Sequence, residues 1–503
     1  MGCFLGLDIG TSSVKACLVD ERGRVVASES VRLGMKTPHP GWAEQDPEDW
    51  WRASAKAIRA VVRKKGGKKR TVDAVGLTGQ MHTSVFLDRH NDVIRPALLW
   101  CDGRTTSQCQ SIVEQVGLEN LRSWVSNPAL EGFTLPKILW LRDVEPQAFR
   151  RLSKVLLPKD YIRFRLTGDM ATEPSDAAGT LLFDVAARRW SDEMFQALSL
   201  APGLVPEVGE SAGVLGRINA AAAKAIGIEA GIPVVGGGAD NACGAISVGA
   251  VSPGSVVASW GTSGTVLAPS STPIIDPQLR AHTFCHAVPD TWYVMGVMLS
   301  AGSAFAWHSD QLARELPENG RALRLNREAA GIAPGADGVT FLPYLQGERT
   351  PHRDADARAV FAGLSLAHTR AHMTRAVLEG ICFGLRDCLS IIEELGLAVP
   401  QVLLTGGGAR VPFLRKLQSD VFGKKVVPVE NSEGPAFGAA LLAAVGAKAF
   451  PNVKVAAGKT LRHGSAEAPD RRVHREFDEP YARFRRLYPA LRDALKQPPA
   501  ATK

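Results

Sequence analysis

Two aspartates occupy positions where a carboxylate could do chemistry, and the first of them is Asp240. A strand-like stretch ending at Val235 is followed by three glycines, Gly236 to Gly238, which lead to Asp240. Glycines keep side chains away, so a carboxylate placed there could meet a substrate in a cleft. An aspartate within reach of a hydroxyl is a common general base for phosphoryl transfer to an alcohol. Asp240 is therefore our candidate catalytic base, and the alternative is that it caps the helix that follows.

The second aspartate, Asp8, lies within the apolar run Phe4 to Ile9, with no basic residue near it before Lys15. A carboxylate buried in such a run is costly unless something compensates its charge. A magnesium ion carried by a nucleotide would do so, because Mg²⁺ is typically held by one or two carboxylates together with phosphates and waters. We expect Asp8 to be associated with the metal, and the alternative is an aspartate that caps the following turn.

Short turns rich in glycine and hydroxyl groups occur twice, at Gly10 to Ser13 and at Gly261 to Gly264. A turn without side chains lets backbone N–H groups approach an oxygen anion, and Thr11, Ser12, Ser13 and Thr262 add hydroxyl donors. Two such turns could hold one polyphosphate from both sides, although either alone could be a plain hairpin. Neither a Walker-type loop nor a dinucleotide-binding G-x-G-x-x-G follows any strand-like run, so those two kinds of site are not supported.

A third glycine cluster, Gly406, Gly407 and Gly408, follows a strand-like run and precedes a helix expected over 412–422 that ends at Gly423. A corner of this kind admits a flat ligand against bare backbone, and an adenine ring is one candidate.

Strand-like runs alternate with helical patterns along the whole chain, which favours an α/β fold. Asp46 followed by Pro47 and two acidic residues is typical of a capped helix start. A second helix is expected from Val377 to Ile392, and glycines at 380 and 384 would let another backbone approach it closely.

The two hydroxyl-rich turns lie about half a chain apart, and each connects two strand-like runs. This repeat predicts two related lobes produced by duplication. No proline-rich or serine-rich linker separates them, and we place the boundary near residue 247, giving lobes over 1–247 and 248–503. The last forty residues predict a terminal helical segment packed on the second lobe, with no part in function.

Composition places limits on the function. The chain has 503 residues, of which 45% are apolar and 22% charged, with a net charge of +8. The basic residues are not concentrated on one part of the chain. The one basic run, 63–70, is expected to be a solvated loop, with an anionic partner as the alternative. Nucleic-acid binding is therefore not expected.

We expect a cytoplasmic protein that does not enter membranes. The cysteines are scattered, no leader is expected, and no apolar run is long enough to span a bilayer.

Taken together, the motifs resemble those of the FGGY carbohydrate kinases, in the family's order and to about residue 490. The motifs are Leu5 to Ser13, Gly79 to His82, Gly132 to Trp140, Leu157 to Tyr161, Ser175 to Thr180, Gly236 to Asn241, Gly261 to Gly264, Leu342 to His352 and Gly406 to Arg410. The resemblance implies two actin-like, ribonuclease-H-like lobes with an active-site cleft between them.

The resemblance also implies roles for individual residues. Asp240 matches the catalytic base and Asp8 the metal-associated aspartate. The residues implied on the sugar side are Met81, His82, Trp100, Asp102, Arg104, Asp240 and Asn241. The residues implied on the nucleotide side are Thr11, Ser12, Ser13, Gly261, Thr262, Gly302, Gly406, Gly407 and Gly408. Thr83 and Pro412 depart from patterns found in the family.

The implied activity is phosphorylation of a sugar by ATP with Mg²⁺. The Gln80-Met81-His82 triplet and the run Gly347 to His352 favour a ketopentose, so that D-xylulose would give D-xylulose 5-phosphate. Kinases for ribulose, arabinitol or gluconate are the alternatives within the enzyme class. Outside it stand a non-catalytic sugar-binding regulator, an actin-like filament former and a nucleic-acid binder. The expected partners are the sugar and ATP, with a homodimer as a candidate assembly.

Overall fold

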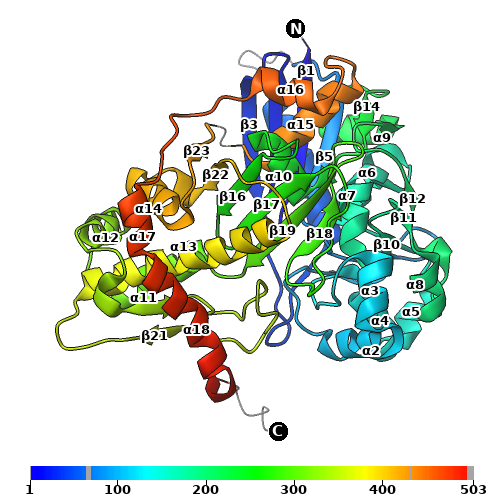
Figure 1. The fold of residues 1–503 in the computed structure, drawn as a ribbon. Helices are drawn as coiled ribbons and strands as arrows, with labels where there is room; N and C mark the ends of the chain where they lie inside the picture. The colour runs from blue at the N-terminus through cyan, green and yellow to red at the C-terminus, as the bar shows by residue number, and fades with distance from the viewer. Residues whose placement is uncertain (1, 64–69, 431–432, 496–503) are drawn as a thin grey trace.

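The structure is a computed structural model that describes residues 2–63, 70–430 and 433–495. Two lobes, each built on a mixed sheet, form the body of the molecule (Figure 1). This arrangement confirms the expected α/β class. Nearly all of the basic run at 63–70 lies outside the described residues.

The first sheet has the strand order β13-β14-β5-β1-β2-β3, and β15 also pairs with β5. β1 and β2 form an antiparallel hairpin, whereas β1 and β5 are parallel, with Asp8 opposite Thr78. Its strands are β1 (Cys3–Ile9), β2 (Ser13–Asp20), β3 (Val25–Arg32), β5 (Ala74–Gly79), β13 (Val214–Arg217), β14 (Pro233–Val235) and β15 (Gly238–Ala239).

The second sheet has the order β18-β19-β17-β16-β22-β23. β16 and β17 form an antiparallel hairpin and β16 is parallel to β22, as β1 is to β5. Its strands are β16 (Val256–Trp260), β17 (Gly264–Ser270), β18 (His282–Cys285), β19 (Trp292–Met298), β22 (Val402–Gly406) and β23 (Val426–Pro428). The two predicted hairpins therefore occupy equivalent places in two similar sheets.

Helices of the first half cover the first sheet and build an outer subdomain over α2 to α5 (Figure 1). The Asp46 carboxylate accepts the N–H of Glu48, which confirms the predicted cap. The helices are α1 (Pro47–Val62), α2 (Thr106–Val116), α3 (Leu118–Val125), α4 (Thr134–Val144), α5 (Pro146–Arg151), α6 (Pro158–Thr167), α7 (Pro174–Ala177), α8 (Asp192–Ala197), α9 (Ala220–Ile226) and α10 (Asp240–Val248), with 3-10 turns η1 (Ala178–Thr180) and η2 (Pro202–Leu204).

Four helices of the second half, α11, α12, α14 and α18, pack against the long helix α13. A Cβ at Gly380 would lie 2.3 Å from the Phe341 carbonyl oxygen, so the predicted close backbone approach is present. The helices are α11 (Gly302–Leu312), α12 (Arg321–Ala330), α13 (Arg370–Glu394), α14 (Pro412–Phe422), α15 (Pro435–Gly446), α16 (Val453–Thr460), α17 (Arg471–Glu476) and α18 (Asp478–Leu495), with η3 (Ala336–Gly338) and η4 (Gly407–Ala409).

Short strands complete the structure: β4 (Glu44–Gln45), β6 (Val85–Leu87), β7 (Ala97–Leu98), β8 (Lys154–Leu156), β9 (Ala171–Thr172), β10 (Phe183–Asp184), β11 (Arg189–Trp190), β12 (Glu207–Val208), β20 (Thr340–Leu342) and β21 (Val360–Ala362). Phe477 and Phe484 are buried in the core of the second lobe, as predicted for the terminal helical segment. Over the residues that the structure describes, no helix is both long and apolar enough to span a bilayer.

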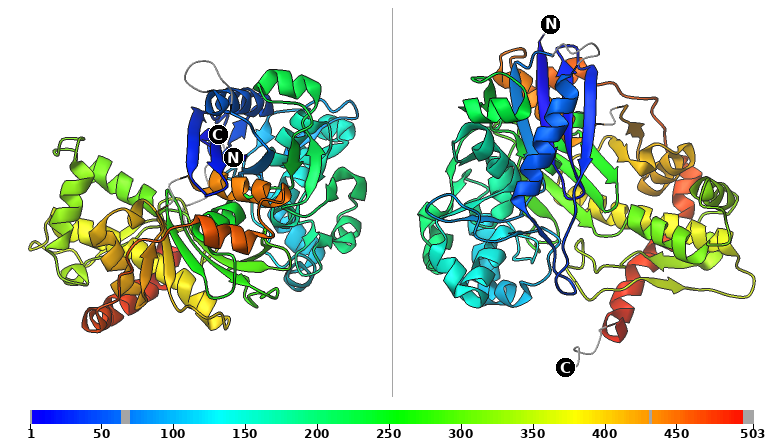
Figure 2. Two further views of the ribbon diagram at one scale, coloured as in Figure 1. Left: turned by 90° about the horizontal axis from the view of Figure 1, so that it is seen from above. Right: turned by 180° about the vertical axis from the view of Figure 1, so that it is seen from behind.

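One element of the second half belongs to the first lobe. α15 packs directly on β1 and β5 and against α10, between the two lobes in the view from above (Figure 2). A Cβ at Gly6 or Gly76 would lie 1.8 or 2.0 Å from a carbonyl oxygen of α15, and one at Gly438 would lie 2.0 Å from the Cys243 carbonyl. A single boundary near residue 247 therefore does not separate the two packed bodies, because an alanine-rich helix from beyond it crosses back.

Candidate active site

Asp8 and Asp240 lie at the same edge of the first sheet. β15 pairs in parallel with the end of β5, with Gly238 opposite Thr78, and Asp8 of β1 lies opposite the same threonine. Asp240 follows β15 at once as the first residue of α10. Carboxyl ends of neighbouring parallel strands converge at one sheet edge, and this is where ligands bind in open α/β sheets.

The environment of each carboxylate disfavours its charge. Burial and the nearby Asp240 raise the pKa of Asp8 to about 7, against the opposing effect of Lys15. Burial likewise raises the pKa of Asp240 to about 6, although its Oδ1 accepts the N–H of Asn241 at 2.7 Å. Paired titratable groups with shifted pKa values in one place are typical of functional sites. The Oδ1 atom of Asp8 is buried and has no hydrogen-bond partner in the described part of the chain.

One alternative for Asp240 is corrected. The residue that caps α10 is Ala239, so Asp240 is not a helix cap. The carboxylate lines a cavity, as expected, but the glycines before it are closely packed. A Cβ at Gly236 would lie 2.4 Å from the Glu210 carbonyl oxygen, and one at Gly237 would lie 1.9 Å from that of Leu77. These glycines therefore let the chain press against β5 and the segment around Glu210.

The two hydroxyl-rich turns join equivalent strands but close differently. Gly10 N–H donates to the carbonyl of Ser13, three residues on, whereas Gly261 N–H donates to that of Ser263, two residues on, both at 3.1 Å. Thr262 is exposed at the tip of its turn, and its carbonyl accepts the N–H of Ser303 at the start of α11. A Cβ at Gly302 would lie 2.5 Å from the Gly261 carbonyl oxygen, so Gly302 meets the second turn as the resemblance implies.

The hydroxyl group of Thr11 is already engaged. It donates to Gln80 Oε1 at 3.0 Å and accepts from Trp100 Nε1 at 2.9 Å. This differs from the prediction that the hydroxyl serves a phosphate. Ser12 and Ser13, which follow it, are exposed and half-buried respectively.

Asp240 faces a cavity of about 200 Å³ between α10 and the second sheet. A second cavity of about 330 Å³ is lined by Gly406, Ala409 and Arg410, and the two share Thr405 and Gly434. Sequence reasoning did not single out Thr405 and Gly434. Thr405 adjoins the predicted glycine cluster, whereas Gly434 precedes α15 and only the fold brings it there.

The glycine cluster at 406–408 packs against Trp260. Gly406 has φ +81°, and its missing Cβ would lie 2.3 Å from the Trp260 carbonyl oxygen. A Cβ at Gly408 would lie 2.6 Å from the indole ring. Only glycine fits at these two positions, and β22, η4 and α14 follow one another as the predicted strand, corner and helix.

Met81 and His82 lie together across from Asn241. The Asn241 side-chain amide donates to the Met81 sulfur at 3.5 Å, and His82 Nδ1 lies 2.5 Å from the Gly179 carbonyl oxygen. Burial lowers the pKa of His82 well below its usual value, so its ring is neutral. A Cβ at Gly179 would lie 2.8 Å from His82 Nδ1, which explains the glycine in that motif.

Trp100, Asp102 and Arg104 do not act as one group. Trp100 donates to the hydroxyl of Thr11 in the first turn. The Asp102 carboxylate instead accepts hydrogen bonds from Ala43 N–H at 2.6 Å and from the Arg104 guanidinium at 2.7 Å. The Arg104 guanidinium lies 3.6 Å from the centre of the Trp42 ring. These contacts give Asp102 and Arg104 a structural role, and their contact with a sugar stays a prediction.

The second lobe also reaches the predicted sugar side through Arg349, which lies in the run Gly347 to His352 but was not itself predicted to be a site residue. A Cβ at Gly132 would lie 2.8 Å from an Arg349 guanidinium nitrogen. The charges of Lys137 and Arg349 help to lower the pKa of His82. Arg349 belongs to one of the motifs quoted above, but only the fold places it beside the other lobe.

Two family domains together account for most of the chain. The FGGY family of carbohydrate kinases, N-terminal domain, matches residues 3–247, and its C-terminal domain matches residues 256–447. The chain belongs to the FGGY family of carbohydrate kinases. As an FGGY kinase it is an ATP-dependent sugar kinase, and the two-lobed fold is the one that the family resemblance implied.

Several relatives of this FGGY kinase are known. The xylulose kinase of Escherichia coli K12 is 40% identical over 97% of this chain and 99% of its own. The xylulose kinase of Bacillus subtilis 168 is 37% identical, with 98% of each chain covered. The crystal structure of xylulose kinase from Rhodospirillum rubrum superposes with a TM-score of 0.91 at 31% identity, over 98% of this chain and 99% of that one.

Proposed function

We propose that this FGGY kinase transfers the γ-phosphoryl group of ATP to the terminal hydroxyl of D-xylulose, giving ADP and D-xylulose 5-phosphate, with Asp240 as the general base. The observation that carries the proposal is the convergence of Asp8 and Asp240 on one sheet edge, where Asp240 lines a cavity that the second sheet also lines. The xylulose kinases described above are similar over almost the whole chain, which supports the sugar.

Asp240 supplies the chemistry that the acceptor needs. It takes the proton of the sugar hydroxyl as the new oxygen–phosphorus bond forms, while the bond to the β-phosphate oxygen breaks and ADP leaves. A pKa of about 6 keeps this base ionised at neutral pH. Asn241 then links the base to the sugar side, because its amide donates to Met81.

The remaining residues bind and orient the substrates. The turns at 10–13 and 261–264 present backbone N–H groups from both lobes toward the phosphates, and the corner at 406–408 takes the nucleoside. The partner-free Oδ1 of Asp8 fits a cation, so Asp8 would hold Mg²⁺, which neutralises phosphate charge when bound. The buried thiols of Cys243, Cys382 and Cys388 form no disulfide, which supports the cytoplasmic setting that we propose.

The substitution Asp240→Asn tests the role of the base. Turnover should fall about a hundred- to ten-thousand-fold, while the KM for ATP stays within about twofold, because the amide occupies the same space without accepting the proton. Steady-state kinetics by coupled ADP release measures both constants. Full turnover in this variant would rule out Asp240 as the base.

The identity of the sugar has its own test. D-xylulose, ribulose, arabinitol and gluconate are compared by kcat/KM in the same assay. We expect D-xylulose to be preferred, and a higher value for any of the others would assign the enzyme to that sugar.

Thr83, which departs from the family's glycine, is buried and its hydroxyl accepts the N–H of Trp100 at 3.1 Å, so its role is structural.

A further inference from the structure

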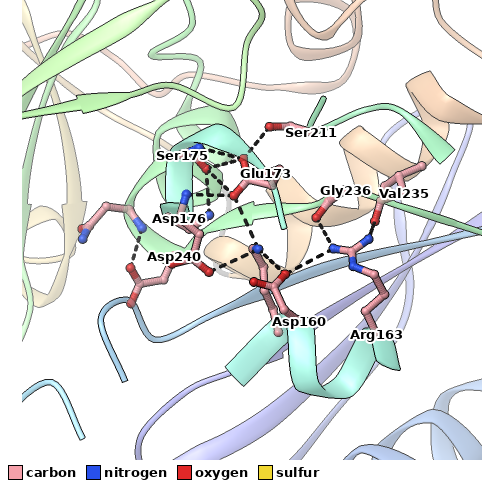
Figure 3. Close-up of polar contacts among 12 residues, drawn as sticks. Asp160, Arg163, Glu173, Ser175, Asp176, Ser211, Val235, Gly236 and Asp240 are labelled. Atoms are coloured by element: carbon pink, nitrogen blue, oxygen red, sulfur yellow. Dashed lines mark hydrogen bonds and ion pairs between the residues drawn. The ribbon is translucent and has the colours of Figure 1, made fainter. Parts of the chain in front are cut away.

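A buried network of charged residues lies directly behind Asp240, and the reaction outlined above uses none of it (Figure 3). Lys159 Nζ lies 2.6 Å from Asp160, 3.6 Å from Glu173 and 3.3 Å from Asp176. All four side chains and that of Arg163 are fully buried.

Such a network is a costly way to stabilise a core. Apolar side chains of similar volume often do as well as a buried ion pair or better, because each ion loses its hydration on burial. Desolvation also raises the pKa of Asp176 well above its usual value. Because the network is costly, we examined which parts of the chain its side chains contact.

Side chains of the network form hydrogen bonds with the chain segment that precedes Asp240. Arg163 donates to the carbonyl oxygens of Val235 and Gly236, at 2.8 and 2.5 Å. At the other end of the glycine run, Ala239 N–H donates to Ser175 Oγ at 3.0 Å. Glycines are the most flexible residues, so a run of three before a reactive carboxylate needs outside contacts to have one conformation.

Glu173 orients the Ser175 hydroxyl. Its carboxylate accepts the Ser175 hydroxyl at 2.8 Å, and the N–H groups of Ser175 and Asp176 at 2.9 Å each. With its proton committed to Glu173, the serine oxygen has a lone pair to offer to Ala239 N–H. Figure 3 shows Glu173 and Ser175 hydrogen-bonded to each other close to Asp240.

We propose that Ser175, oriented by Glu173, is a positioning residue for Asp240 and acts through the backbone N–H of Ala239. The inference deepens the proposed function and rests on Asp240 being the base. A misplacement of the carboxylate by a fraction of an ångström would slow proton transfer without weakening nucleotide binding.

The chain offers a matched control in Ser211. Its hydroxyl also donates to Glu173, at 2.7 Å, and it is equally buried, but this hydroxyl does not contact Ala239. Ser175→Ala should lower kcat tenfold or more with the KM for ATP within twofold, whereas Ser211→Ala should keep kcat within twofold. Equal effects of the two substitutions, or an unchanged kcat in S175A, would overturn the proposal.

A double-mutant cycle separates this inference from the function on which it rests. If Ser175 acts through Asp240, adding S175A to D240N should lower kcat by less than twofold. A tenfold loss in that background would overturn the positioning role. Full turnover in D240N alone would instead refute the proposed base.

Folding of the variants is checked by thermal unfolding. If S175A fails to fold, Ser175→Cys replaces it, with S211C as the control. The cysteine sulfur would lie near the position of the serine oxygen but accepts hydrogen bonds poorly. We then expect kcat to fall at least threefold in S175C alone. An unchanged kcat in S175C would count against the proposal.

Discussion

As the proposed base, Asp240 shows at the scale of one residue how catalysis would conflict with stability. Burial makes the carboxylate a better base at neutral pH and also makes its charge costly to the folded protein. Active sites commonly carry such a cost, since removal of the functional group often stabilises the protein.

The pKa of Asp240 predicts how stability depends on pH. Its folded-state value of about 6 lies above the ordinary 3.8, so the favourable contribution of the protonated form is lost as pH rises through about 6. At pH 8 the ionised group costs on the order of 3 kcal/mol. Asp240→Asn should therefore raise the melting temperature at pH 8 by a few degrees and at pH 5 by about half as much, because the loss runs from the ordinary pKa to the folded-state value. Scanning fluorimetry tests this, and equal shifts at both pH values would contradict it.

The same pKa predicts how activity depends on pH. The base must be ionised to accept a proton, so kcat should fall as pH is lowered through about 6. A pH–rate profile with D-xylulose at saturation measures this. A kcat that is constant down to pH 4.5 would mean that the titrating group is not on the reaction path.

Asp8 could be found from the sequence because a carboxylate inside an apolar run is anomalous wherever the run folds, and Asp240 because it follows a strand-like run and three glycines. Sequence reasoning could not find Arg349 or Ser175 as site residues. Arg349 approaches the site only through the docking of the second lobe, and Ser175 only through a hydrogen bond to a residue 64 positions away. The sequence predicted that the Thr11 hydroxyl binds phosphate. It could not show that this hydroxyl donates to Gln80, because that hydrogen bond depends on tertiary contacts.

At the scale of elements, α15 has the most demanding packing. Small residues let it contact β1, β5 and α10 backbone to backbone, as the carbonyl contacts at Gly6, Gly76 and Gly438 show. The two hairpins were predictable because their turn residues repeat. The placement of α15 was not, since an apolar alanine-rich helix packs equally well on either lobe.

Two helical glycines form a matched pair that tests this packing. Gly438→Ala should lower the free energy of unfolding by about 3 kcal/mol or more, because the new methyl group would lie 2.0 Å from the Cys243 carbonyl oxygen. Gly458→Ala in α16, whose Cβ meets nothing within 4 Å, should raise it by about 0.5–1 kcal/mol. Urea unfolding of both variants measures the difference. A harmless G438A would mean that α10 and α15 are less tightly packed than described.

At the scale of the whole molecule, the lobes contact each other around the site. Asn127 of the first lobe donates to the Thr283 carbonyl of β18 at 2.8 Å, and Gly132 of the first lobe lies against the Arg349 guanidinium of the second. Met81 and His82 are only 3% and 7% exposed. If they contact the sugar as proposed, part of the structure must move to admit it, and we expect the lobes to separate and close again.

Closure should be visible in solution as compaction. The D240N variant can hold ATP and D-xylulose together with little turnover, and its radius of gyration by small-angle scattering should be smaller with both substrates than with neither. Each substrate alone should give a lesser change, because one ligand contacts mainly one lobe and only the pair bridges the cavity that both lobes line. Gluconate in place of D-xylulose serves as the control. An unchanged radius with both substrates bound would show that sugar reaches Met81 and His82 by local movement, for instance of the segment around Arg349, without movement of the lobes.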